Sequence, residues 1–233
     1  VLNKAITSTD LVMENGWPKD SNGGTIPCKG DGWEYIKNDP TNGDMLLLTG
    51  SSQTGGLYDF SAIGDGSAVE CKVFVGMPTA ITGGEFNGKV FNNSGILGGT
   101  FNGPVENRGP GIIKDGTFHK PVENDGTIEK GTFNDAVKNN STIENGTFNG
   151  PVDNTELGTI KDGTFTYKVE NNGIITGGVF NRNANLTGVT GGYNITVASN
   201  AKIEKVNGVS ADWAPYVVTS NATTKEVTIT ADT

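Results

Sequence analysis

Acidic side chains recur at matching places along the middle of the chain, where pairs of them could serve as general acid and nucleophile. Glu129 and Glu144 are 15 residues apart, and a repeat of that length would place them on neighbouring strands about 5 Å apart. That separation suits retaining glycoside hydrolysis. Regularly repeated outward charges produce such pairs by default, so we predict no catalytic residue and keep a polysaccharide lyase or glycoside hydrolase as the alternative. The other charged candidates on the repeat are Asp115, Asp162, Lys114, Lys130 and Lys161.

The chain has few side chains that could bind a metal ion. His119 is the only histidine and Cys28 and Cys71 are the only cysteines, so a zinc site of the usual type lacks ligands. Aspartates in glycine-rich loops could hold calcium through oxygen atoms, although none matches an EF-hand. We therefore predict no cofactor, with calcium as the alternative. The aspartates in question are Asp31, Asp39, Asp44, Asp59 and Asp65.

A sequence repeat must position all of these side chains. Each repeat has a Phe, with Gly two residues before it and Ile five residues before it, and Val follows four residues after all but the last Phe. Successive Phe residues are 15 or 17 positions apart, and a fixed short period is typical of a solenoid. The Phe residues are Phe86, Phe101, Phe118, Phe133, Phe148, Phe165 and Phe180.

The repeat unit, Ile-x-x-Gly-x-Phe-x-x-x-Val-x-Asn, leaves no room for a helix. Period-two alternation places Phe and Val on one face of a strand, and Ile reaches the same interior only if the chain bends at the intervening Gly. We predict an all-β fold: a single-stranded parallel β-helix with short rungs of 15–17 residues and irregular N- and C-terminal caps. The crossover rule favours right-handed coiling.

The two longer rungs carry their extra residues in one corner of the unit. The insertions fall in residues 107–111 and 154–158. Only a turn can bulge without breaking the ladder between rungs, so we expect both segments to protrude from the same edge.

An Asn follows each Val by two residues and lies in the turn-forming part of the unit. Asn accepts turn conformations, and stacked Asn side chains form ladders between strands. We predict a structural ladder that bonds to the neighbouring rung and to local backbone, and a polar ligand stripe is the alternative. The column comprises Asn92, Asn107, Asn124, Asn139, Asn154 and Asn171.

Threonine forms two outward columns, one before Phe and one before Ile. Flat threonine ladders on short-rung solenoids resemble ice-binding proteins, but the Gly bend separates the two columns. Thr is also a favourable exposed strand residue, and we favour this structural interpretation. The columns comprise Thr100, Thr117, Thr132, Thr147 and Thr164, and Thr127, Thr142 and Thr159.

The flanking segments are less regular, and we divide the chain into three parts. Residues 1–80 are predicted to form an N-terminal cap with irregular first rungs, residues 81–190 the regular repeats, and residues 191–233 the C-terminal strands and cap. Caps are needed because an open solenoid end exposes strand edges and apolar surface. Strands are expected at 45–48, 58–60, 71–75, 194–197 and 201–203, and a hairpin at 216–218 and 226–230.

The three tryptophans are the candidate ligand-binding residues. Trp17 and Trp33 lie in the N-terminal segment and Trp213 in the C-terminal one. An indole ring can act as a platform for a sugar, and the alternative is that it covers an end of the core, as terminal repeats require.

The composition restricts the partners. The chain has 233 residues and a net charge of −9, which argues against nucleic acid, since that partner requires a basic face. No apolar run is long enough to cross a bilayer, so we expect no membrane insertion of this fragment. Because the chain begins at Val1, we expect that a leader or a longer parent chain has been removed.

Two segments carry a resemblance to a known class of proteins. Gly98-Gly99-Thr100-Phe101-Asn102-Gly103-Pro104-Val105-Glu106-Asn107 and residues 144–154 resemble β-helical repeats of bacterial cell-surface and adhesin-like proteins. The stretch from Gly32-Trp33-Glu34-Tyr35 to residues 46–50 is similar to the beginning of such solenoids, so the resemblance covers residues 33–190. It implies export, surface display and contact with glycans or host surface proteins, and it transfers no catalytic residue.

Export would make a disulfide between Cys28 and Cys71 reasonable, with two reduced, buried thiols as the alternative. We expect a secreted or cell-surface, adhesin-like or glycan-binding module without catalysis. A passive structural spacer and a glycan-active enzyme remain the alternatives.

Overall fold

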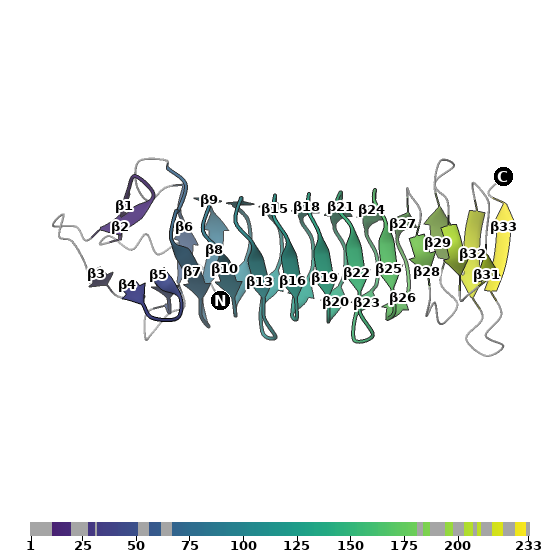
Figure 1. The fold of residues 1–233 in the computed structure, drawn as a ribbon, viewed down its shortest axis with the longest axis horizontal. Coiled ribbons are helices and arrows are strands. Elements are labelled where there is room, and N and C mark those ends of the chain that lie inside the picture. The colour runs from purple at the N-terminus through teal and green to yellow at the C-terminus, as the bar shows by residue number, and fades with distance from the viewer. Residues whose placement is uncertain are drawn as a thin grey trace. The chain divides into compact units, whose positions relative to one another are not determined.

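The computed structural model describes residues 11–19, 28–30, 32–50, 56–61, 67–180, 184–186, 194–197, 203–206, 209–210, 216–220 and 227–231. Its regular elements are all strands, and most of them stack in parallel as a β-solenoid (Figure 1). The predicted all-β, short-rung parallel solenoid is thereby confirmed. The chain divides into two compact units, Val1–Lys120 and Pro121–Thr233, which we call the N-unit and the C-unit.

The N-unit begins with antiparallel strands and continues as a parallel solenoid. Its first pair, β1 and β2, is antiparallel, and so are the successive pairs of β3, β4 and β5. From β5 onward, β7 and the later strands pair in parallel. The strands are β1 (Val12–Glu14), β2 (Trp17–Lys19), β3 (Cys28–Gly30), β4 (Trp33–Asp39), β5 (Gly43–Leu48), β6 (Leu57–Asp59), β7 (Lys72–Val75), β8 (Ala80–Gly83), β9 (Glu85–Phe86), β10 (Val90–Asn92), β11 (Gly95–Ile96), β12 (Thr100–Phe101), β13 (Val105–Asn107), β14 (Ile112–Ile113) and β15 (Thr117–Phe118).

The C-unit contains further rungs of the same kind and ends in an antiparallel hairpin. Its strands are β16 (Val122–Asn124), β17 (Thr127–Ile128), β18 (Thr132–Phe133), β19 (Val137–Asn139), β20 (Thr142–Ile143), β21 (Thr147–Phe148), β22 (Val152–Asn154), β23 (Thr159–Ile160), β24 (Thr164–Phe165), β25 (Val169–Asn171), β26 (Ile174–Ile175), β27 (Val179–Phe180), β28 (Ala184–Leu186), β29 (Asn194–Val197), β30 (Ile203–Val206), β31 (Val209–Ser210), β32 (Tyr216–Ser220) and β33 (Val227–Ala231).

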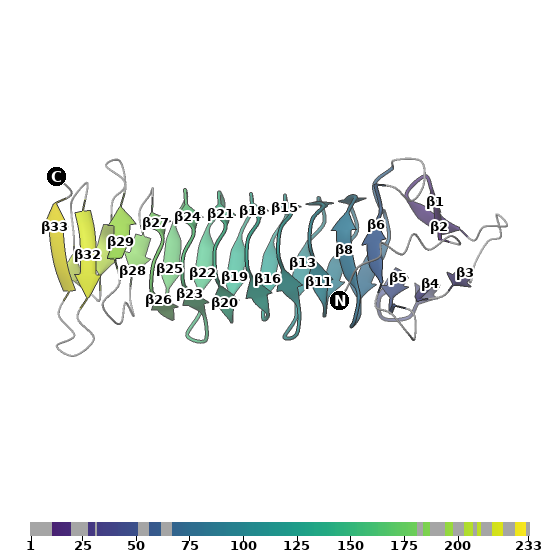
Figure 2. The ribbon, with the colours of Figure 1, turned by 180° about the vertical axis from the view of Figure 1, so that it is seen from behind.

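Each regular rung contributes one short strand to each of three sheets. In the C-unit the sheets run β16-β19-β22-β25, β17-β20-β23-β26 and β18-β21-β24-β27. Their register matches like with like: Val137 with Val152, Ile143 with Ile160, and so on. Seen from behind, β20, β23 and β26 lie one after another (Figure 2). The Phe, Ile and Val columns therefore face one shared interior.

Stacked phenylalanines form the centre of the core. In the C-unit, Phe133, Phe148, Phe165 and Phe180 are fully buried, and each ring centre lies 4.8 Å from the next. The interplanar angles are 6 to 8°, because the rung spacing sets one orientation for every ring. The N-unit repeats this arrangement with rings of Phe86, Phe101 and Phe118.

The predicted bend at the Gly before each Phe is confirmed. These glycines have φ between +110° and +148°, a region that side-chain-bearing residues rarely adopt. The bend also directs the carbonyl group of the Gly toward the next rung. For example, the Gly146 oxygen accepts the backbone N–H of Thr164, in the next rung, at 2.8 Å. The members of the column are Gly84, Gly99, Gly116, Gly131, Gly146, Gly163 and Gly178.

The Asn column is a buried ladder, as predicted. In the C-unit, Nδ2 of Asn124 donates to Oδ1 of Asn139, Asn139 to Asn154, and Asn154 to Asn171, at 2.5 to 2.7 Å. Hydrogen bonds to backbone oxygens complete the ladder. For example, Asn139 Nδ2 donates to the carbonyl oxygen of Ser141 at 3.0 Å. All of these side chains are at most 2% exposed, which rules out a ligand stripe.

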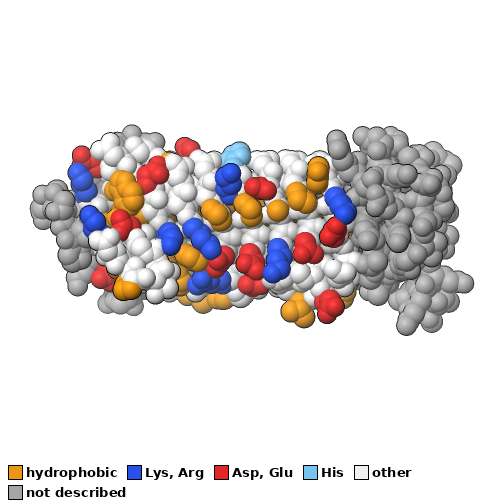
Figure 3. Space-filling model, viewed as in Figure 1, with side chains coloured by type: hydrophobic (Ala, Val, Ile, Leu, Met, Phe, Trp, Pro, Cys, Tyr) orange, Lys and Arg blue, Asp and Glu red, His pale blue; other side chains and the backbone are white. Residues whose placement is uncertain are grey.

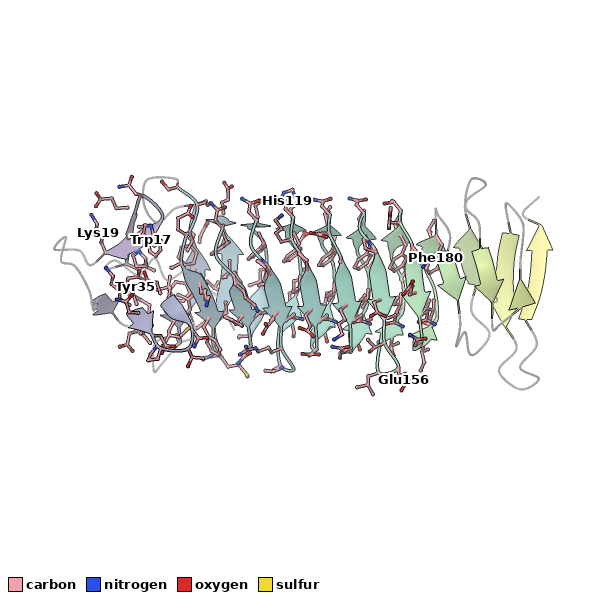
Figure 4. The ribbon with its side chains drawn as sticks, viewed as in Figure 1. Trp17, Lys19, Tyr35, His119, Glu156 and Phe180 are labelled. Atoms are coloured by element: carbon pink, nitrogen blue, oxygen red, sulfur yellow. The ribbon has the colours of Figure 1, made fainter. Side chains whose placement is uncertain are left out.

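Both predicted insertions are turns, and they occur at the same corner of the repeat: one in the N-unit and one in the C-unit. The backbone N–H of Gly158 donates to the carbonyl oxygen of Thr155 at 2.9 Å, and that of Gly111 donates to the carbonyl oxygen of Arg108 at 2.5 Å. Glu156 lies at the tip of the second turn (Figure 4). The ladder strands on either side keep their register, since Asn139 pairs with Asn154 and Ile143 with Ile160.

The N-terminal segment differs from expectation at β4. No strand is expected around Trp33 and Tyr35, but these residues lie in a seven-residue strand that pairs antiparallel with β5. The turn follows at Asp39, whose carboxylate accepts the backbone N–H groups of Thr41 and Asn42 at 3.0 and 2.7 Å. The expected strands at 45–48, 58–60 and 71–75 correspond to β5, β6 and β7.

The expected C-terminal strands are also present. β29 matches the prediction at 194–197, and β30 begins at the end of the predicted 201–203 segment. β32 and β33 form the predicted hairpin, with Val218 opposite Ile229.

Cys71 carries a free, buried thiol, and the side chain of Cys28 lies outside the described residues. In the N-unit β3 is separated from β7 by β4 and β5, which amounts to about 14 Å at the usual strand spacing. A disulfide needs Cα atoms within about 7 Å, so the arrangement opposes the expected Cys28–Cys71 bond.

We expect the Cys71 thiol to be inert in the folded protein. Burial raises its pKa to about 12, and only the thiolate is nucleophilic. In a Cys28→Ser variant, Ellman's reagent at pH 8 should react with Cys71 only after denaturant is added. Rapid reaction of the native variant would contradict the buried position.

Candidate functional site

One outward face of the C-unit carries a regular array of hydroxyl and amide groups. On β18, β21 and β24 the Phe side chain points inward, so the residues on both sides of it point outward. The threonines stand in register across these strands. We call this surface the polar face; it comprises Thr132, Thr147, Thr164, Asn134, Asn149 and Thr166.

Hydrogen bonds between rungs fix the side chains of Asn134, Asn149 and Thr166 in the polar face. Asn149 Nδ2 donates to Asn134 Oδ1 at 2.9 Å, and Thr166 Oγ1 donates to Asn149 Oδ1 at 3.1 Å. Asn134 and Asn149 are exposed. An amide has two N–H donors and two lone pairs on oxygen, so Asn149 keeps one donor and one acceptor that could bind a ligand hydroxyl.

Tyr167 adds an exposed aromatic side chain directly after Thr166 of the polar face in the sequence. It is 48% exposed. The register of Phe148 with Phe165 gives it the same position in the rung as Gly150. An exposed aromatic ring beside oriented amides is a combination that binding sites use for sugars, since the ring packs on the apolar face of the sugar and the amides bond its hydroxyls.

Sequence reasoning missed Tyr167, although a signal was present. The position two residues after Phe holds a small or charged residue in the other rungs, such as Gly103, Lys120 or Asp135. A single aromatic residue at that position departs from the repeat, and its 48% exposure shows that it does not serve the core.

The two described tryptophans, Trp17 and Trp33, do not form a common site. Trp33 is 2% exposed and belongs to the core, so it cannot present its ring to a ligand. Trp17 is 39% exposed, and its ring meets the edge of Tyr35 with 6.4 Å between centroids (Figure 4). Trp213 lies outside the described residues.

The carboxylates considered for catalysis have structural partners. Glu144 pairs with Lys161 at 2.8 Å. Asp162 and Asp115 each accept the backbone N–H of the following glycine, at 2.8 and 2.9 Å, and so help to hold the Gly bend. His119 is exposed at the outer edge of its rung (Figure 4).

Of the aspartates considered for calcium, Asp39, Asp44 and Asp59 are described, and each lies at or near the end of a strand of the N-unit. Asp44 accepts from the Asn38 N–H at 2.8 Å, and Asp59 accepts from the Ser61 hydroxyl and N–H. The backbone N–H groups of Asn42 and Thr41 lower the pKa of Asp39. Within the described ranges no three His, Cys, Asp or Glu side chains gather as a metal site would require; Asp31 and Asp65 fall outside those ranges.

A second cluster lies on the outer face of β7, β10 and β13 in the N-unit. Glu106 accepts hydrogen bonds from Lys89 Nζ and from Arg108 Nε and Nη2, the last two at 3.3 and 3.0 Å. The Arg108 Cζ lies 4.5 Å from the ring centre of Phe91 and 5.9 Å from that of Phe74. Lys89 Nζ lies 4.8 Å from the ring centre of Phe91, so both cations sit above aromatic rings. We call these five residues the cationic–aromatic cluster.

The electrostatics of this cluster favour the ionised form of Glu106. Partial burial raises the pKa of this carboxyl, but hydrogen bonds from Lys89 and Arg108 and their charges outweigh it, so the pKa lies below its ordinary value of 4.5.

We expect the cluster to lose its stabilising contribution in acid. Because the folded-state pKa of Glu106 is lowered, the contribution is present above pH 4.5 and disappears as the pH falls through the folded-state value. Denaturant unfolding of wild type and Glu106→Gln should differ by about 1 kcal/mol at neutral pH and converge as the pH falls through the lowered folded-state pKa of Glu106.

A matched control is Glu123→Gln, because Glu123 pairs with Lys138 at 3.2 Å and is 45% exposed. It should cost less at neutral pH, since exposed pairs contribute little. A wild-type-to-Glu106→Gln difference that stays constant from neutral pH to acid would contradict the ion-pair interpretation.

The comparisons with known proteins add no relative to this picture. No family model, no curated protein and no solved structure matches the chain. Among the described residues, none belongs to a helix that is long and apolar enough to cross a membrane.

Proposed function

We propose that this chain is a glycan-binding module of an exported surface protein, adhesin-like and without catalysis. The observation that carries the proposal is the polar face together with the exposed Tyr167 that follows Thr166. The repeat gives this face its rigidity, since every outward Thr and Asn is adjacent to a Phe that is locked in the core. A preorganised surface loses little conformational entropy on binding, which favours affinity for a flexible oligosaccharide.

A binding function is supported over an enzymatic one by the roles of the acids. Asp115 and Asp162 hold backbone bends, and Glu144 holds a lysine of the next rung. A passive structural spacer is the second candidate. The uniform Phe and Asn columns favour it, because each rung that repeats them lengthens the solenoid and adds no new surface feature.

A glycan array of the purified chain, with and without calcium, tests the proposal. We expect selective binding that Tyr167→Ala weakens about tenfold, because an aromatic contact contributes roughly 1.5 kcal/mol. Leu157→Ala is the matched control, since Leu157 is 80% exposed in the same unit but lies in the corner turn. Trp17→Ala tests the other exposed aromatic ring.

Silence across the array under both conditions would favour the spacer. Binding that survives Tyr167→Ala but not Trp17→Ala would move the site to the N-unit.

A further inference from the structure

The cationic–aromatic cluster departs from the repeat on which it lies. Its strands pair in register, with Phe91 opposite Phe74 on one side and Glu106 on the other. The matching outward position in the C-unit is charged in each regular rung: Glu123, Lys138, Asp153 and Glu170. Aromatic residues at this outward position are not required by the solenoid core, which already has its own Phe column.

The charges of the cluster do not cancel. Lys89 and Arg108 contribute +2 and Glu106 contributes −1, which leaves +1 on a chain whose net charge is −9. Figure 3 shows basic side chains beside an apolar patch over this part of the N-unit. The nearby Lys72 donates to the backbone oxygen of Asn42 and holds the β4–β5 turn, so we do not include it in the cluster.

Both cations keep hydrogen-bonding capacity that Glu106 does not use. A guanidinium has five N–H donors, and Glu106 accepts from Nε and Nη2 of Arg108, leaving Nη1 for another acceptor. The side chains of Lys89 and Arg108 are 33% and 41% exposed. Planar carboxylates are the partners that Arg binds best, through paired N–H···O bonds.

We propose that the cationic–aromatic cluster binds the carboxylate of an acidic glycan, a chain that contains uronic acid residues. This proposal rests on the proposed function and names the ligand class of a second site. The ligand carboxylate would bond to Arg108 and Lys89, and the apolar face of its sugar ring would pack against Phe74, which is partly exposed. Charge complementarity supports an anionic occupant here, because Lys89 and Arg108 leave a local charge of +1 beside Glu106.

A substitution of Glu106 tests the proposal, because it should raise the affinity for the ligand and not lower it. The Glu106 carboxylate occupies donors that the ligand would use, so it competes with the ligand. Removing its charge should tighten binding, whereas removing a cation should weaken it. A merely structural role predicts that each of these substitutions either weakens binding or leaves it unchanged.

Titration calorimetry at low ionic strength would compare an oligomer of galacturonic acid with the same oligomer after its carboxyl groups are reduced to alcohols. We expect the acidic oligomer to bind at least tenfold more tightly. Arg108→Gln and Lys89→Gln should each weaken it about tenfold, as expected for a charge-assisted hydrogen bond, and Glu106→Gln should strengthen it severalfold. Lys138→Gln, which removes an exposed lysine paired with Glu123 in the C-unit, should have no effect.

Several results would overturn the assignment. Equal binding of the acidic and reduced oligomers would do so, as would weakening by Glu106→Gln in a variant whose circular dichroism is unchanged. Tighter binding of a sulfated oligosaccharide than of the uronate would reassign the site to another anion. If the array detects neutral glycans while the uronate does not bind, this inference fails and the proposed function stands; if neither binds, both fail.

Discussion

Replacing Phe148 by alanine should lower the free energy of unfolding by about 4 kcal/mol, the range that buried Phe→Ala changes show. The ring is fully buried, and its centre lies 4.8 Å from those of Phe133 and Phe165. The substitution removes one ring from a stack and leaves the rings on both sides facing a cavity. Stacking adds about 1 kcal/mol per ring pair beyond burial.

The cavity left by Phe148→Ala cannot close by collapse of its walls. The flanking rungs are held at fixed spacing by backbone bonds, with Thr147 N–H to Gly131 oxygen at 2.8 Å and Thr164 N–H to Gly146 oxygen at 2.8 Å. The measurement is equilibrium denaturation followed by circular dichroism. Leu157→Ala, which shortens an exposed apolar side chain in the same unit, should change stability by less than about 0.5 kcal/mol. A loss below about 1 kcal/mol for Phe148→Ala would show that the core repacks freely.

Replacing Asn139 by alanine should cost about 3 to 5 kcal/mol. Asn139 is fully buried; it accepts from Asn124 and donates to Asn154 and to the oxygen of Ser141. Alanine leaves an amide donor of Asn124 and the Oδ1 of Asn154 without this partner. Each buried polar group that loses its bond costs about 1 to 3 kcal/mol.

The neighbouring Asn140 provides the control. It is partly exposed and bonds to Asp125 at 2.8 Å and to Thr155 at 3.1 Å. Water can replace the partners of an exposed amide, so Asn140→Ala should cost less than about 1 kcal/mol. Similar losses for the two substitutions would contradict the buried ladder as a main source of stability.

The periodic part of the fold could be predicted because the same residue types recur at the same positions in every rung. Phe, Ile and Val mark the inward positions, Gly marks the bend, and Asn marks the corner, so a single ambiguous rung does not change the interpretation. Each of these columns has its predicted place in the structure. The two insertions were placed correctly because only one corner tolerates extra residues.

The features that depart from the repeat could not all be predicted in the same way. Trp33 and Tyr35 stand among Gly, Asp and Asn residues that usually mark turns, but pairing with β5 holds this segment as a strand. The cationic–aromatic cluster was missed because Lys89 and Glu106 are 17 residues apart, and they meet only through the register of the rungs. Tyr167 is visible in the sequence only when the outward positions are compared rung by rung.

The Asn ladder has a direction. From Asn124 through Asn139 and Asn154 to Asn171, every amide donates toward the C-terminal side, and Asn92 donates to Asn107 in the same sense. Aligned hydrogen bonds polarise one another, so the strength of each link depends on the length of the unbroken chain around it. A duplicated rung that carries Asn would lengthen one polarised column, whereas a rung without it would divide the column into two shorter ones. The ladder therefore sets a rule for how such a protein can grow: whole rungs, added in phase, each with its own amide.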